Sequence, residues 1–217
     1  MGGDCLNYGC VPSKALLRSA KAALQPRSAC FGVGAVAPAL RWEDVAARVQ
    51  RVIDSIAPHD SVERFTALGV EVLQGQGRLA GPRRVEVALN AGGTRSLEGK
   101  ALVLATGSGP LVPPVPGLAE AGYLTNETVF SHPVQPRRLC VLGGGPIGLE
   151  LGQAFARLGS QVTVVEMLPR VLPREDADAA AVVARALQAD GIALRTGLQA
   201  VRVQGGPGGK RVLCRST

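Results

Sequence analysis

The sequence of 217 residues predicts an α/β protein, and three stretches with different apolar spacing support this prediction. Residues 12–24 are rich in Ala and Leu and have the character of a helix. Residues 70–105 contain short apolar runs separated by glycine turns, as successive strands do. Residues 138–166 combine a strand, a glycine-rich turn, a helix and a second strand, which is typical of a parallel sheet covered by helices.

Composition and charge exclude several classes of partner. No apolar run is long enough to span a bilayer and no signal peptide precedes the first cysteine, so we expect no membrane partner. The net charge of +7 comes from scattered arginines without aromatic platforms, which disfavours nucleic-acid binding. The five cysteines are odd in number and three of them lie far apart, so they do not form a secreted disulfide framework. A reducing cytoplasm is the expected compartment.

Two cysteines lie close together at the start of the chain. Cys5 and Cys10 stand just before Pro12, and proline suits the first turn of a helix because it lacks an N–H group. Cys10 is therefore expected at a helix N-terminus, where the helix dipole favours a thiolate, and Cys5 could close a reversible disulfide with it. The alternatives are two structural cysteines or half of a metal site. A metal site would need a second cluster, but His59 and His132 stand alone.

The middle of the chain predicts helices followed by strands. Residues 42–68 have helical apolar spacing, which Pro58 interrupts so that a second helical piece begins after it. Apolar residues within 70–73 and 85–89 then alternate as in an antiparallel meander. Residues 101–105 form a continuous apolar run, which predicts a strand buried on both faces. The small residues directly after this run would let a ligand approach the backbone.

A glycine-rich turn follows the predicted strand at residues 138–142. Gly143 permits the tight turn, Gly145 the approach of a pyrophosphate, and Gly148 the close packing of helix on strand. Glu166 ends the next predicted strand, 18 residues after Gly148. A lone G-x-G-x-x-G pattern is weak, but here it follows a strand, opens a helix and is followed by an acid, so we predict dinucleotide binding.

Glu166 also predicts which dinucleotide is bound. A carboxylate at this position accepts hydrogen bonds from the ribose hydroxyls of NAD and repels the 2′-phosphate of NADP. Arg170 lies four residues further on and could soften the repulsion, but we expect the acid to decide in favour of NAD.

The remaining residues complete this unit. Cys140, within the first strand, is expected to be a small buried apolar residue. Residues 177–187 predict a second helix and residues 192–194 a strand. A last pair of short strands is predicted at residues 201–203 and 212–214, around a glycine-rich turn.

Two motifs resemble those of one enzyme family. Residues 2–14 read G-G-D-C-L-N-Y-G-C-V-P-S-K, which resembles the active site of the flavin-dependent pyridine nucleotide-disulfide oxidoreductases, except that Asp4 stands where that family has Thr. The family includes dihydrolipoamide dehydrogenase, mercuric reductase and glutathione reductase. Residues 105–117 are similar to the family segment that approaches FAD. This second similarity implies four FAD-binding residues: Ala105, Thr106, Gly107 and Ser108.

The resemblance implies roles for the residues near the thiols. Cys10 would lie against the flavin and Cys5 would exchange with the substrate disulfide. Glu150 would form an ion pair with Lys14 beside the flavin ring, although a carboxylate in the first turn of a helix is also favoured by the helix dipole alone. Electrons would pass from NADH through FAD to a Cys5–Cys10 disulfide, and then to a small disulfide such as lipoamide or to Hg(II).

The resemblance also divides the chain into domains. Residues 1–120 would form part of an FAD-binding domain, residues 121–136 a connector, and residues 137–217 a truncated NAD(P)-binding domain. The implied fold is two incomplete Rossmann-like nucleotide-binding domains with an antiparallel meander. Family members begin with a further strand–glycine–helix unit and end with a dimerisation domain, neither of which this sequence shows, and the full-length family member is expected to be a homodimer. The alternative function is therefore a catalytically inactive fragment that at most binds a dinucleotide.

Overall fold

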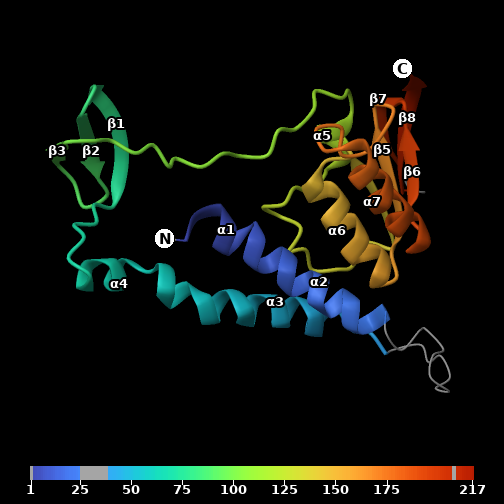
Figure 1. The fold of residues 1–217 in the computed structure, drawn as a ribbon, viewed down its shortest axis with the longest axis horizontal. Coiled ribbons are helices and arrows are strands. Elements are labelled where there is room, and N and C mark those ends of the chain that lie inside the picture. The colour runs from blue at the N-terminus through green and yellow to red at the C-terminus, as the bar shows by residue number, and fades with distance from the viewer. Residues whose placement is uncertain (1, 25–38, 207–208) are drawn as a thin grey trace.

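The computed structural model describes residues 2–24, 39–206 and 209–217, and it begins with a group of helices (Figure 1). The two long ones are α2 (Cys10–Leu24) and α3 (Trp42–Ile56), which pack side by side. The short ones are α1 (Gly3–Asn7), the 3-10 helix η2 (Ala57–Asp60) and α4 (Val62–Ala67). The predicted break at Pro58 is confirmed, because this proline lies in η2 and Ser61 then caps α4 by accepting a hydrogen bond from Arg64 N.

The predicted antiparallel meander is confirmed, with shifted boundaries. Its strands β1 (Gly75–Gly81), β2 (Arg84–Leu89) and β3 (Thr94–Glu98) pair in the order β1-β2-β3. The strand predicted at residues 70–73 is wrong, because the first strand of the meander is β1 at Gly75–Gly81, and the mostly polar sequence of β3 did not predict a strand. Most side chains of the three-stranded meander are exposed, and Val87 of β2 is its buried residue.

The predicted buried strand at residues 101–105 is wrong. These residues form no strand and belong to the long extended stretch between β3 and the short helix α5 (Leu118–Ala121) in Figure 1. Val103 is 85% exposed and Leu104 is 64% exposed. A strand needs a neighbouring strand to pair its N–H and C=O groups, and none of the described strands lies beside this stretch. The apolar composition alone therefore did not produce a strand.

The C-terminal half forms a parallel sheet with helices, as predicted. Strands β4 (Arg138–Leu142), β5 (Gln161–Glu166) and β6 (Ala193–Thr196) pair in the order β4-β5-β6. Helices α6 (Pro146–Arg157) and α7 (Ala177–Ala189) connect them. Strands β7 (Leu198–Gly206) and β8 (Gly209–Ser216) form the predicted antiparallel pair.

The prediction that Cys140 is buried is wrong. Cys140 lies in β4 as expected, but its side chain is exposed. The reason is that successive side chains of a strand point to opposite faces, and it is the neighbouring Val141 that packs against Gly148 and Gly152 of α6. Partial desolvation still raises the pKa of the Cys140 thiol, and the nearby Cys214 thiol raises it further.

One hydrophobic core connects the N-terminal helices to the parallel sheet. Leu16 of α2, Trp42 of α3 and Phe155 of α6 are buried in it together. The Trp42 and Phe155 ring centroids lie 5.4 Å apart, and Trp42 Nε1 donates a hydrogen bond of 2.9 Å to the carbonyl oxygen of His132. The helix that carries Cys10 is thereby fixed against the unit that carries the glycine turn. Within the described ranges, no helix is both long and apolar enough to cross a membrane.

Candidate functional site

The two thiols lie where the short helix α1 meets the long helix α2. Cys5 is in α1 and Cys10 is the first residue of α2, as the prediction of a helix N-terminus requires. Gly9 allows the two segments to approach closely, because a Cβ atom there would lie 3.0 Å from Asp4 O and 3.2 Å from Cys5 Cα. Both thiols are free and exposed, so this corner of the molecule presents a pair of cysteines to solvent.

The two thiols interact with one another. The main cause that raises the pKa of Cys5 is its side-chain hydrogen bond with Cys10, followed by desolvation. A hydrogen bond to the Cys10 backbone acts in the opposite direction and lowers the pKa of Cys5. The net effect holds Cys5 as a neutral thiol to higher pH than an isolated cysteine.

Replacing Cys10 with alanine is therefore expected to shift the reactivity of Cys5 to lower pH. The raising contribution of the Cys10 side chain is lost, while the lowering contribution of its backbone remains. The measurement is the rate of iodoacetamide labelling of the Cys5 peptide as a function of pH. Cys214→Ala is the control and should leave the Cys5 profile unchanged. A profile that stays in place or moves to higher pH in Cys10→Ala would contradict the expectation.

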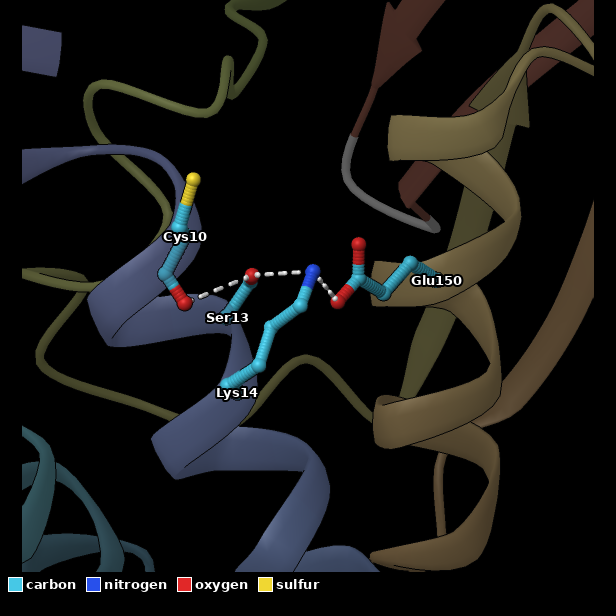
Figure 2. A network of polar contacts seen from close by, with 4 residues as sticks. All are labelled: Cys10, Ser13, Lys14 and Glu150. Carbon is cyan, nitrogen blue, oxygen red and sulfur yellow. Dashed lines mark hydrogen bonds and ion pairs between the residues drawn. The ribbon is translucent and has the colours of Figure 1, made fainter. Parts of the chain in front are cut away.

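A polar network extends from the start of α2 to α6 (Figure 2). Lys14 Nζ lies 2.6 Å from Glu150 Oε1 and 3.5 Å from Ser13 Oγ, and Ser13 Oγ donates a hydrogen bond of 3.4 Å to the Cys10 carbonyl oxygen. The Lys14 side chain is 65% exposed and that of Glu150 is 24% exposed. Because solvent screens such a pair, it stabilises the fold by only about 0–1 kcal/mol. Its importance is positional, since it connects the helix of Cys10 to the helix after the glycine turn.

The glycine turn has the shape of a phosphate-binding loop. Gly143 has φ +106°, a left-handed conformation that favours glycine. Gly145 is the N-cap of α6, makes no side-chain cap, and has no atom within 4 Å of where its Cβ would lie. At Gly148 a Cβ would lie 2.9 Å from Val141 Cγ1 and 3.0 Å from Gly143 O. Space is therefore open beside Gly145 at the start of α6, and a helix N-terminus is a place where a pyrophosphate can bind.

Glu166 lies directly beside this turn. Its side chain is only 8% exposed, and its two carboxylate oxygens accept hydrogen bonds from the backbone of different residues. Oε2 accepts from Gly144 N at 2.6 Å and Oε1 from Leu168 N at 2.8 Å. Each oxygen keeps lone pairs for a further donor such as a ribose hydroxyl. The residues present thus fit a dinucleotide with an unmodified ribose. The hydrogen bond from Gly144 N to Glu166 could not be predicted from the sequence, because Gly144 occupies a position of the G-x-G-x-x-G pattern that any residue may fill.

The residues that the resemblance assigns to FAD are divided between two places. The Lys14–Glu150 pair joins α2, the helix that begins at Cys10, to α6. Residues 105–108 instead lie in the exposed stretch and make no hydrogen bond to another described element. His59 is exposed in η2, and His132 lies between α5 and β4, where its Nδ1 is 2.7 Å from the Val134 carbonyl oxygen. The described residues therefore assemble one part of the expected FAD contacts and leave the other part apart.

The chain is similar to known proteins over nearly its whole length. The mercuric reductase of Streptomyces lividans is 37% identical over 208 residues, which cover 94% of this chain and 44% of that protein. The dihydrolipoyl dehydrogenase of Thermus scotoductus is 36% identical over 216 residues, which cover 98% of this chain and 45% of that protein. The crystal structure of LpdA from Mycobacterium tuberculosis matches with a TM-score of 0.81 at 28% identity, covering 99% of this chain and 47% of that one.

The chain thus spans a little under half the length of these relatives. Both named activities belong to oxidoreductases, and the solved structure shares the α/β fold described above. The model of one family, described as pyridine nucleotide-disulphide oxidoreductase, matches residues 1–216. With nearly every residue included in that match, the chain belongs to the pyridine nucleotide-disulphide oxidoreductases, whose family cofactors are FAD and NAD(P)H.

Proposed function

We propose that this chain supplies the redox-active disulfide and the dinucleotide-binding unit of an FAD-dependent NAD(P)H:disulfide oxidoreductase. The observation that carries the proposal is the 2.6 Å contact between Lys14 and Glu150, because it joins the helix of one reactive thiol to the helix of the glycine turn. Family membership supports the same reading. We expect the whole enzyme to be a homodimer, as the resemblance implies. We expect it to be cytoplasmic, because its five cysteines do not form a secreted disulfide framework.

The chain's own residues would perform the exchange with the acceptor. FAD and a nicotinamide dinucleotide, when bound, supply the hydride chemistry that reduces the cysteine pair. The Cys5 thiolate then attacks one sulfur of a small disulfide such as lipoamide, the acceptor S–S bond breaks, and the released sulfur takes a proton. The Cys10 thiolate attacks Cys5 Sγ, releases the second acceptor thiol and closes the Cys5–Cys10 disulfide. The pair loses two electrons and the acceptor gains two. Hg(II) is the second acceptor that the family suggests.

This exchange step can be tested without either cofactor. The reduced chain with oxidised glutathione is expected to form a Cys5–Cys10 disulfide and to release glutathione thiol, which mass mapping and thiol counting would detect. Cys10→Ser should instead accumulate a glutathione adduct at Cys5, because the resolving thiol is absent. Cys214→Ser is the control and should behave like the unmodified chain. A bridge to Cys214, or to Cys30 outside the described residues, would refute the assignment.

The alternative is that this chain, as it stands, is catalytically inactive and at most binds a dinucleotide through residues 137–217. The exposed, unpaired stretch at residues 101–108 favours this alternative for the isolated chain.

We therefore expect no sustained NADH oxidation with lipoamide, oxidised glutathione or Hg(II), even with excess FAD. The reason is that residues 105–108 are not brought to the Lys14–Glu150 pair. The assay follows NADH absorbance over many turnovers, with Cys10→Ser as the control. Turnover that Cys10→Ser abolishes would show that the chain rebuilds a flavin site by itself.

A further inference from the structure

Arg170 is enclosed by the loop that follows β5. Its guanidinium donates three hydrogen bonds to backbone carbonyl oxygens of this loop: Nη1 to Leu172 at 2.7 Å, and Nη2 to Pro173 at 3.0 Å and to Glu175 at 2.8 Å. The side chain is half-buried, and no described carboxylate forms an ion pair with it. The rigid fork of an arginine suits this use, because several carbonyl oxygens can be bound at once.

Leu172 is the strained residue that this arginine holds. Among the described residues it is the only non-glycine with positive φ, at +49°. The Cβ atom of a residue other than glycine disfavours this conformation, so the surrounding structure must maintain it. The Leu172 carbonyl oxygen accepts from Arg170, and its N–H donates a hydrogen bond of 2.9 Å to Gly144 O. Leu172 is therefore held on both sides, by the arginine and by the glycine turn.

Gly144 connects this loop to the acid of the dinucleotide site. Its N–H donates to Glu166 Oε2 at 2.6 Å while its carbonyl oxygen accepts from Leu172. Its surroundings are crowded, since a Cβ there would lie 3.0 Å from Val171 Cγ1 and 3.2 Å from Glu166 Cβ. A continuous set of hydrogen bonds thus runs from Arg170 through Leu172 and Gly144 to Glu166.

We propose that Arg170 is a positioning residue for the dinucleotide, which holds Leu172 in its left-handed conformation and thereby keeps Gly144 and Glu166 in place. The proposal rests on the dinucleotide binding proposed above. This role differs from the softening of the repulsion between Glu166 and a 2′-phosphate, for which the position of Arg170 four residues after Glu166 would also allow. A guanidinium bound to three carbonyl oxygens is not free to pair with a 2′-phosphate, so it does not soften the repulsion of NADPH by Glu166.

The test is a double-mutant rescue, with NADH affinity measured by fluorescence titration and NADPH titrated in parallel. Arg170→Gln is expected to weaken both ligands by the same factor, about 10-fold, as the left-handed turn relaxes. Leu172→Gly alone should change NADH affinity by less than about 3-fold, because glycine adopts positive φ without strain. The double variant should return to within about 3-fold of the unmodified chain, because glycine no longer needs the arginine to hold the turn.

The outcomes separate the inference from the function on which it rests. Circular dichroism and thermal unfolding verify that each variant is folded, and if Arg170→Gln does not fold, Arg170→Lys, which keeps the charge but not the fork, replaces it. Unchanged NADH binding in Arg170→Gln, a double variant no better than Arg170→Gln, or a loss confined to NADPH would each overturn the inference. An unmodified chain that does not bind NADH would refute the proposed dinucleotide function, and the inference with it.

Discussion

Replacing Gly145 with alanine is expected to weaken NADH binding by roughly 10- to 100-fold while leaving thermal stability almost unchanged. No atom lies within 4 Å of the position that the new methyl group would occupy, so the protein itself accommodates it. The pyrophosphate would have to occupy the same open space in front of the α6 N-terminus, and the methyl group would force it away. Fluorescence titration with NADH gives the affinity, and thermal unfolding gives the stability.

Gly148→Ala is the matched control, because it places the same methyl group three residues further on with the opposite consequence. A Cβ at Gly148 would meet Val141 Cγ1 at 2.9 Å and Gly143 O at 3.0 Å. The overpacking should lower the free energy of unfolding by about 1–3 kcal/mol. If Gly145→Ala binds NADH as tightly as the unmodified chain, the pyrophosphate does not pass over this turn.

The unmodified chain is expected to bind NADH in preference to NADPH by roughly tenfold or more, and Glu166→Ala should narrow this gap. The buried carboxylate offers acceptors to ribose hydroxyls and repels a 2′-phosphate. The variant should also bind NADH itself more weakly, because the carboxylate holds the N–H groups of Gly144 and Leu168. Parallel titrations with the two dinucleotides measure both effects.

Glu175→Ala is the control for this prediction. It removes an exposed acid from the same loop and keeps the backbone carbonyl to which Arg170 donates, so the ratio of the two affinities should not change. NADPH binding by the unmodified chain that equals or exceeds NADH binding would refute the role of Glu166.

The parts of the fold that sequence patterns predicted depend on local physical chemistry. Helix α2 begins at Cys10 because the residues after it favour a helix and Pro12 is tolerated in its first turn. The unit from β4 to β5 follows from a glycine turn between two apolar strands. The wrong predictions depend on neighbours instead. Residues 101–105 would form a strand only beside another strand, and Cys140 would be buried only if another element covered its face of the sheet. A local sequence pattern contains neither kind of information.

The candidate site shows the same division. Spacing identified Gly143, Gly145 and Glu166, while the ion pair of Lys14 with Glu150 came from a family resemblance. The bonds of Arg170 to three carbonyl oxygens could not be predicted, because they depend on the positive φ of Leu172, which no sequence pattern marks. The packing of Trp42 on Phe155 joins residues far apart in the sequence, and no periodicity within one helix indicates its partner in another.

The extended stretch between β3 and α5 has a consequence for how this sequence can vary in length. Lys14 and Glu150 are 136 residues apart along the chain, yet their helices pack directly on one another. Insertions or deletions in the exposed stretch would therefore leave the spacing between the thiols and the glycine turn unchanged. Doubling a flexible connection costs only about 0.6 kcal/mol in chain entropy. The packing of α2 on α6 should tolerate such changes, provided that they lie outside residues 105–108, whereas a one-residue insertion within either helix would turn Lys14 or Glu150 away from the other.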